Sequence, residues 1–114
     1  MLNNNKYKVA VIGGAGHIGL PLSCYISSHE NDVLIVDTNN ENLEKIRSNK
    51  TPFKDDGLEE YIKIANRNNL KLSNNIEFIS DYELVIITLG TSSSQGITEI
   101  FESLMESVLE NISK

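Results

Sequence analysis

The sequence predicts an α/β fold, in which helices cover a sheet of parallel strands. Three observations carry this prediction: short apolar runs at residues 7–12, 33–37 and 84–89, helical periodicity between the runs, and a glycine-rich turn directly after the first run. Apolar runs that lack a polar face are typical of parallel strands buried on both sides. A length of 114 residues fits a single domain, so we expect no internal domain boundary.

Bulk composition narrows the classes of function. The formal net charge is −6, with 10 basic against 16 acidic residues, which argues against a nucleic-acid surface. Cys24 is the only cysteine, so an intrachain disulfide is impossible and a cysteine-based metal site is not expected. The asparagine-rich start has no apolar core of a signal peptide, and no run is long enough to span a membrane. We therefore expect a cytoplasmic protein.

The first half of the chain alternates strand and helix. Residues 7–12 form the first predicted strand and residues 33–37 the second. Between them a helix over residues 17–27 places these apolar side chains at helical spacing: Ile18, Leu22, Tyr25 and Ile26. After the second strand, Thr38 and Glu41 are spaced as a capping box for a helix that carries Leu43 and Ile46.

The second half continues the alternation. Asp56 and Glu59 are spaced as another capping box, which opens a helix whose predicted apolar stripe is Leu58, Tyr61, Ile62 and Ala65. Two strands follow, at residues 76–79 and 84–89, and then a polar turn at 90–96. The last predicted helix extends to Lys114 and has the clearest apolar face in the chain: Ile97, Ile100, Phe101, Leu104, Met105, Val108, Leu109 and Ile112.

Strands joined by helical crossovers fix the predicted topology. Right-handed crossovers place the four strands in the order 3-2-1-4, which is a Rossmann-like parallel sheet lacking the second half of the dinucleotide-binding fold. We therefore interpret residues 1–114 as one partial cofactor-binding domain. The strand at residues 84–89 would lie at the sheet edge with unpaired backbone groups, so we also expect self-association through that edge.

The glycine turn predicts a dinucleotide site. Gly14, Gly16 and Gly19 have the spacing at which the first glycine allows a sharp turn, the second lets a pyrophosphate approach and the third permits close helix packing. The amides at the helix start then hold the pyrophosphate. Asp37 ends the second strand, where a carboxylate accepts hydrogen bonds from the adenosine ribose. Because no basic residue follows until Lys45, NAD is predicted rather than NADP.

Other interpretations of these residues stay open. The glycines can form a turn that binds nothing, and Gly13, Gly16 and Gly19 also fit the GxxGxxG turn of short-chain dehydrogenases, which include nucleotide-sugar epimerases. We interpret His17 as lining the pyrophosphate or the helix entrance and not as a catalytic base. Cys24 is interpreted as a small packing residue.

Four segments decide between these interpretations: residues 13–22 (Gly-Gly-Ala-Gly-His-Ile-Gly-Leu-Pro-Leu), 36–37 (Val-Asp), 51–60 (Thr-Pro-Phe-Lys-Asp-Asp-Gly-Leu-Glu-Glu) and 87–91 (Ile-Thr-Leu-Gly-Thr). In this order they resemble the N-terminal NAD-binding domain of the UDP-glucose/GDP-mannose dehydrogenase family, most of all its UDP-N-acetylmannosamine dehydrogenase branch. The Gly-Leu-Pro-Leu element and the segment at residues 51–60 are more specific than the glycines, and we expect neither in an epimerase.

The resemblance implies a function and a set of site residues. Members of the family oxidise the C6 hydroxyl of a nucleotide sugar to a carboxylate with NAD, and their products feed surface polysaccharides. By the resemblance, the residues that line the coenzyme are Gly14, Gly16, His17 and Ile18 at the pyrophosphate, Asp37 at the ribose, and Leu89, Gly90 and Thr91 after the last strand. This chain departs from the family pattern at Asn42 and Ser92, where many members have a basic residue and a proline.

The resemblance implies no catalytic residue in this chain. The family's nucleophilic cysteine, catalytic lysine and sugar-nucleotide contacts lie beyond the position of Lys114, and Cys24 does not match that cysteine. We therefore expect an NAD-binding portion of a nucleotide-sugar dehydrogenase that is inactive alone, with a nucleotide sugar as partner only when the rest of the enzyme is present. The alternatives are a stand-alone NAD-binding regulatory module, a fragment of a nucleotide-sugar epimerase, and a scaffold that binds no nucleotide.

Overall fold

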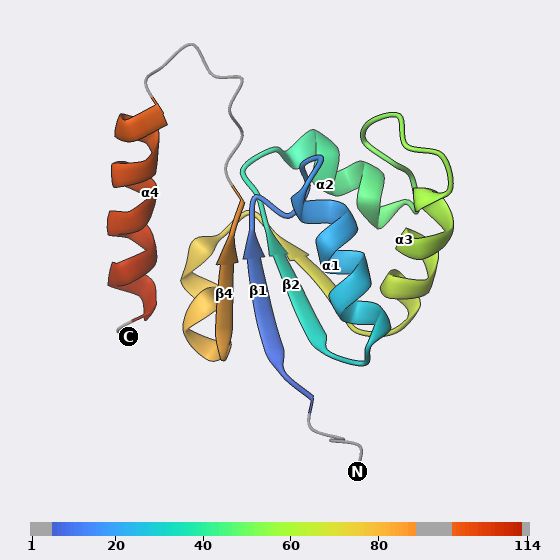
Figure 1. Cartoon of the computed structure of the whole chain (residues 1–114), viewed down its shortest axis with the longest axis horizontal. Helices are drawn as coiled ribbons and strands as arrows, with labels where there is room; N and C mark the ends of the chain where they lie inside the picture. The colour runs from blue at the N-terminus through green and yellow to red at the C-terminus, as the bar shows by residue number, and fades with distance from the viewer. Residues whose placement is uncertain (1–5, 89–96, 113–114) are drawn as a thin grey trace.

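The structure, a computed structural model, describes residues 6–88 and 97–112. Its elements in chain order are β1 (Lys8–Ile12), α1 (Gly19–Ser28), β2 (Asp32–Val36), α2 (Asn40–Arg47), α3 (Leu58–Arg67), β3 (Leu70–Ser73), the 3-10 helix η1 (Ile76–Asp81), β4 (Leu84–Ile87) and α4 (Ile97–Ile112). The strands form a parallel sheet in the order β3-β2-β1-β4, which confirms the predicted topology (Figure 1).

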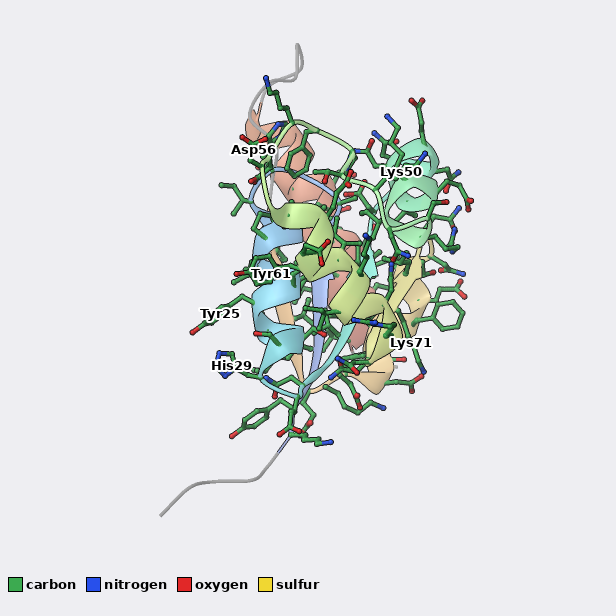
Figure 2. The ribbon with its side chains drawn as sticks, turned by 90° about the vertical axis from the view of Figure 1, so that its right-hand side faces the viewer. Tyr25, His29, Lys50, Asp56, Tyr61 and Lys71 are labelled. Carbon is green, nitrogen blue, oxygen red and sulfur yellow. The ribbon has the colours of Figure 1, made fainter. Side chains whose placement is uncertain are left out.

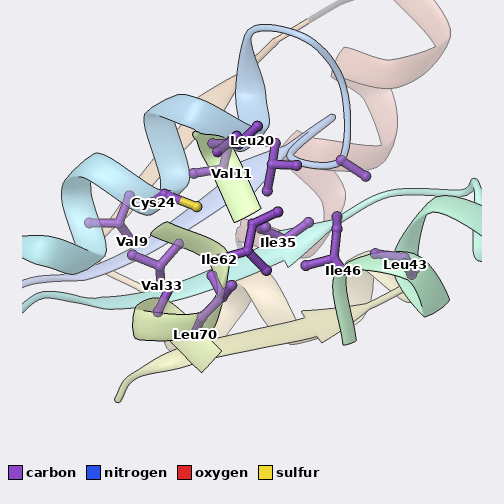
Figure 3. Packing of buried hydrophobic residues seen from close by; sticks show 13 residues of the cluster. Val9, Val11, Leu20, Cys24, Val33, Ile35, Leu43, Ile46, Ile62 and Leu70 are labelled. Atoms are coloured by element: carbon purple, nitrogen blue, oxygen red, sulfur yellow. The ribbon is translucent and has the colours of Figure 1, made fainter. Parts of the chain in front are cut away.

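The sheet is covered on both faces. Both faces of the central strands carry apolar side chains, which must be buried away from water. Val9 and Val11 of β1 and Val33 and Ile35 of β2 point into a core closed by α1, α2 and α3 (Figure 3). The alternate residues of the same strands, Ala10, Ile12, Leu34 and Val36, pack with Ile79 of η1 and Val108 of α4. This two-sided burial is typical of parallel sheets and leaves the strand ends as the place for a site.

The third strand lies earlier in the chain than the sequence predicted. The strand expected at residues 76–79 is wrong: these residues form η1, and β3 is formed by Leu70–Ser73. Leu70 and Leu72 of this strand face the core, whereas Lys71 is exposed, as suits a short edge strand. The side chain of Asn75 caps η1 by accepting a hydrogen bond from the Glu77 amide at 2.9 Å, and this starts a helical turn.

Helix α1 buries a face that agrees only in part with the predicted one. Of the predicted residues, Ile18 and Tyr25 are 71% and 64% exposed, whereas Leu22 and Ile26 are partly buried. The buried residues of α1 are Leu20 and four small ones: Gly19, Ser23, Cys24 and Ser27. The buried hydroxyls are satisfied locally, since Ser23 donates to the Gly19 carbonyl at 2.7 Å and Ser27 to the Asn69 side chain at 2.6 Å. The small side chains of this face let α1 lie close to the sheet, and Tyr25 remains in solvent. Figure 2 shows Tyr25 of α1 and Tyr61 of α3 on the same outer side of the molecule.

Both predicted capping boxes are wrong in detail. Helix α2 is capped by Asn39, whose side-chain oxygen accepts from the Asn42 amide at 3.0 Å, in place of Thr38. Helix α3 has no side-chain cap and begins after Gly57, whose φ of +88° is a left-handed conformation that favours glycine. The buried residues of these helices agree better with the prediction, because Leu43, Ile46, Leu58, Ile62 and Ala65 are all in the core. Tyr61 is the exception, at 59% exposed.

Strand β4 and helix α4 complete the described part of the chain. Within the described residues β4 pairs only with β1 and so lies at one sheet edge, as predicted, although it ends at Ile87. On α4, Val108 is buried and Leu104 packs against the second core, whereas Leu109 and Ile112 are 59% and 48% exposed. The predicted polar turn at residues 90–96 lies outside the described residues, as do the side chains of residues 97–101.

Candidate functional site

An open cleft of about 1100 Å³ lies where β1, β2 and β4 end. In parallel α/β sheets, ligands bind outside the carboxyl ends of the strands where the order reverses, and here that point lies between β1 and β4. The turn after β1, the segment after β2, the end of β4 and helix α4 all contribute to the walls. The principal lining residues are Gly13, Gly16, His17, Ile18, Gly19, Asp37, Thr38, Asn39, Asn42, Ile76, Thr88, Leu104 and Ser107.

The fold itself leaves no room for a side chain at Gly13 and Gly19, and the same holds for Gly14 behind the turn. Gly13 has a φ of +82°, and a Cβ placed on it would lie 2.2 Å from the Thr88 carbonyl oxygen. A Cβ on Gly19 would lie 2.3 Å from the Gly13 carbonyl oxygen. Both distances are far below any real contact, so these two glycines allow the turn to pack against β4 and against itself.

Gly16 differs, because the fold has room for a side chain there. A Cβ on Gly16 would have its nearest neighbour, the Gly13 carbonyl oxygen, at 3.4 Å, which is an ordinary contact. Gly16 also lines the cleft. A glycine that packing does not require, at the position where a pyrophosphate passes closest to the backbone, fits a bound dinucleotide.

The start of α1 offers hydrogen-bond donors to the cleft. Within residues 6–88 and 97–112, no backbone group accepts a hydrogen bond from the amide of His17 or Ile18. Ile18 is the N-cap residue of α1 and supplies no side-chain cap. Both residues line the cleft, so their amides and the positive end of the helix dipole can hold an anion there.

Asp37 is held rigidly beside the turn. One of its carboxylate oxygens, Oδ2, accepts from the Ala15 amide at 3.1 Å, and the other, Oδ1, accepts from the Asn39 amide at 2.9 Å. Each oxygen keeps a further lone pair for a ligand hydroxyl. The carboxylate is thus oriented by two backbone amides of the chain, which is the arrangement that a ribose acceptor needs.

The charges in the cleft are few. Among its described lining residues Asp37 is the only acid and His17 the only side chain able to become a cation. Lys45, the first basic residue after Asp37, forms an ion pair with Glu41 of the same helix at 3.8 Å. A 2′-phosphate beside Asp37 would therefore meet a like charge without a cation to balance it.

The predicted site residues come together only in part. Gly16, His17, Ile18 and Asp37 line the cleft, whereas Gly14 is buried behind the turn, where a Cβ would lie 2.8 Å from the Ile35 side chain. Gly14 therefore serves packing between turn and sheet. Leu89, Gly90 and Thr91 lie outside the described residues.

Two contributors were missed in the sequence. The Thr88 hydroxyl lies 3.0 Å from both the Ile12 and the Gly13 carbonyl oxygens and can donate to either, so it fastens the turn to β4. In the sequence, the only indication of this role is that Thr88 is the polar residue in an otherwise apolar strand run. Phe53, from the loop between α2 and α3, stacks on the His17 ring with centroids 4.2 Å apart. No sequence spacing connects these two aromatic rings.

The remaining reactive side chains do not form a catalytic group. Cys24 is 3% exposed, and burial raises the pKa of its thiol to about 11, so it packs as the sequence indicated. In the described part of the chain, no three His, Cys, Asp or Glu side chains gather as metal ligands would. Nor does any helix in residues 6–88 and 97–112 have the length and apolarity to cross a membrane.

The sheet order, the glycine turn and the fixed acid define a dinucleotide-binding domain of the Rossmann type. Comparison with known sequences gives the particular group. The sequence model of the UDP-glucose/GDP-mannose dehydrogenase family, NAD binding domain, matches residues 7–114, so the chain belongs to this family.

Individual relatives agree with this assignment. UDP-glucose 6-dehydrogenase of Streptococcus pneumoniae is 27% identical over 100 residues, which are 87% of this chain and 25% of that protein. Two solved structures also match. The UDP-N-acetyl-mannosamine dehydrogenase Cap5O of Staphylococcus aureus has a TM-score of 0.74 and 28% identity over 90% of this chain and 26% of its own. The GDP-mannose dehydrogenase of Pseudomonas aeruginosa has a TM-score of 0.83 at 19% identity, over 92% of this chain and 25% of its own, and supports the fold. The chain thus spans about a quarter of the relatives it matches.

Proposed function

We propose that this chain binds NAD as the coenzyme portion of a nucleotide-sugar 6-dehydrogenase. The observation that carries the proposal is Gly16, a cleft residue whose lack of a side chain is not required by packing. The family match over residues 7–114 supports NAD as the ligand. NAD would supply the hydride acceptor for oxidation of a sugar alcohol, and the chain's own residues would only bind and orient it.

Each proposed contact follows from the geometry of the cleft. The amides of His17 and Ile18 would donate to the diphosphate, which would pass over Gly16. The Asp37 carboxylate would accept from the adenosine ribose hydroxyls. Leu89, Gly90 and Thr91 would approach the coenzyme from the segment after β4. Gly14 would support the turn from behind.

The whole protein's reaction is inferred from its relatives. We propose oxidation of the C6 hydroxyl of a UDP-sugar to a carboxylate, in the cytoplasm, toward surface polysaccharides. The named activities of the matched dehydrogenases support this substrate class. No described residue of this chain provides a reactive thiol, since Cys24 is buried on the inner face of α1. The 114-residue chain alone is therefore expected to bind coenzyme without turning over a sugar.

Calorimetry and thermal unfolding with NAD test this proposal. A ligand present at 100 times its Kd stabilises the folded state by about 2.7 kcal/mol, so a binding chain should unfold at a higher temperature in millimolar NAD. Addition of UDP-sugars together with NAD should produce no NADH. An unchanged unfolding temperature with no calorimetric heat would favour the scaffold alternative, and NADH formed at a catalytic rate would contradict the expected inactivity.

A further inference from the structure

The contact between His17 and Phe53 joins the coenzyme cleft to a distant loop. The two rings are nearly parallel, with 22° between their planes and 4.2 Å between their centroids. His17 belongs to the turn after β1, whereas Phe53 belongs to the segment between α2 and α3. The loop that carries Phe53 is thus part of the cleft's surroundings, although Phe53 is not among the lining residues.

The two rings differ in how firmly the protein holds them. Phe53 is partly buried and packs against the large core beneath α1, α2 and α3. His17 is exposed, and within the described residues its imidazole has no hydrogen-bond partner. An exposed imidazole with no other contact samples several rotamers, and stacking on an anchored ring restricts it to one. The orientation of His17 therefore depends on Phe53.

The chemistry of the cleft gives this orientation a consequence. His17 is the only side chain among the described lining residues that can carry a positive charge, in a chain whose formal net charge is −6. It stands at the start of α1, beside the amides that face the cleft. An imidazole N–H held there can donate to a phosphate oxygen, and the hydrogen bond is stronger when the ring is protonated.

We propose that Phe53 is a positioning residue of the coenzyme site, which holds the His17 imidazole in place to donate to the diphosphate. This inference rests on the proposed NAD binding and assigns a role to the segment at residues 51–60. Phe53 would touch neither adenosine nor phosphate, and would act only through the ring it supports.

Ligands that differ in their phosphates separate this role from a general structural one. The Phe53→Leu variant keeps an apolar side chain and loses the ring face. We therefore expect the Kd for NAD and the Kd for ADP to rise three- to tenfold. The Kd for adenosine, measured by NMR titration, should not change. Phe53→Tyr keeps the ring and should restore wild-type affinity for all three ligands. Phe78→Leu, at an aromatic side chain of η1 that is 52% exposed, is the matched control and should change none of them.

A double substitution tests whether Phe53 acts through His17. We expect His17→Ala to weaken ADP binding at least as much as Phe53→Leu, and the double variant to bind no more weakly than His17→Ala alone. Losses that multiply in the double variant, or an equal loss for adenosine, would overturn the positioning role. Unchanged NAD and ADP affinity in Phe53→Leu would do the same. If the unmodified chain binds neither NAD nor ADP, the proposed function itself fails.

A measurement on the unmodified chain avoids the risk that a variant unfolds. Protons of an imidazole stacked on a phenyl face are shielded, so the His17 ring signals should lie upfield of those of histidine in a short unstructured peptide at matched pH. They should move on addition of ADP and stay in place on addition of adenosine. His17 signals at ordinary positions, or with no response to ADP, would overturn the proposal.

Discussion

Asp37 Oδ2 accepts a hydrogen bond from the Ala15 amide at 3.1 Å, which fixes the acid after β2 to the glycine turn after β1. The side-chain amide of Asn42 lies 3.4 Å from the carbonyl oxygen of the same Ala15 residue, to which it donates. The first turn of α2 and the segment before it thus hold Ala15, the middle residue of the glycine turn, through both its amide and its carbonyl group. Both contacts come from the chain itself, so the fold positions the turn and the acid relative to each other.

Replacement of Asp37 by alanine should weaken NAD binding by about ten- to a hundredfold, since hydrogen bonds to a charged group contribute about 1.5–3 kcal/mol. The same change should narrow the preference for NAD over NADP, because the repulsion of the 2′-phosphate disappears. Calorimetry with both dinucleotides measures this. Tighter NADP binding by the unmodified chain would contradict the assignment.

Two glycine substitutions should separate binding from folding. Gly16→Ala places a Cβ at an ordinary contact distance of 3.4 Å, so the free energy of unfolding should stay the same or rise by up to about 1 kcal/mol. NAD binding should nevertheless weaken tenfold or more. Gly19→Ala brings its Cβ to 2.3 Å from the Gly13 carbonyl oxygen and should destabilise the fold by about 2–3 kcal/mol. Urea unfolding and NAD calorimetry on both variants check this, and an unfolded Gly16→Ala would be the contrary result.

Alkaline pH should destabilise the chain through Cys24. Burial raises the pKa of this thiol from 9.0 to about 11, so the folded state favours the neutral form. The stabilisation is complete below pH 9 and is lost as pH rises to 11, with a total of about 2–3 kcal/mol. Cys24→Ala removes the thiol, so the free energy of unfolding of this variant should fall less between pH 9 and 11 than that of the unmodified chain. Parallel curves for the two proteins would contradict the burial of the thiol.

Self-association through the edge at β4 remains a prediction. Within the described residues the outer side of β4 pairs with no strand, and its Leu84 side chain is 49% exposed. Light scattering should therefore show a mass that grows with concentration, and Leu84→Lys should shift the distribution toward monomer. Lys71→Ala, on the opposite edge strand, serves as the comparison variant. A constant monomer mass over a wide concentration range would count against it.

The sequence predicted those parts of the fold that depend on strong apolar runs. Strands β1, β2 and β4 and the order of the sheet follow from such runs and from crossover handedness. Strand β3 was missed because Leu70 and Leu72 are its only apolar residues, too few for a periodic signal. The buried face of α1 was missed because Ser23 and Ser27 are buried through hydrogen bonds made to Gly19 and Asn69, which periodicity does not detect.

The candidate site was predictable where it is local in sequence. The spacing of Gly16 and Gly19 and the position of Asp37 at the end of a strand are both visible in the amino acids alone. The separate roles of these glycines were not, because they depend on which backbone atoms lie beside each absent Cβ. The stacking of Phe53 on His17 depends on how the loop before α3 packs against the turn before α1, and no local pattern carries that information.

The space beside Gly16 also bears on how a domain of this kind would change in descent. Packing would preserve glycine at positions 13, 14 and 19 in any descendant that still folds, whether or not it kept a coenzyme. Position 16 is under no such constraint, so a lineage freed from its ligand could accumulate alanine or serine there at little cost. Among glycines 13, 14, 16 and 19, residue 16 is therefore the one that the cleft and not the packing of the chain would keep unchanged.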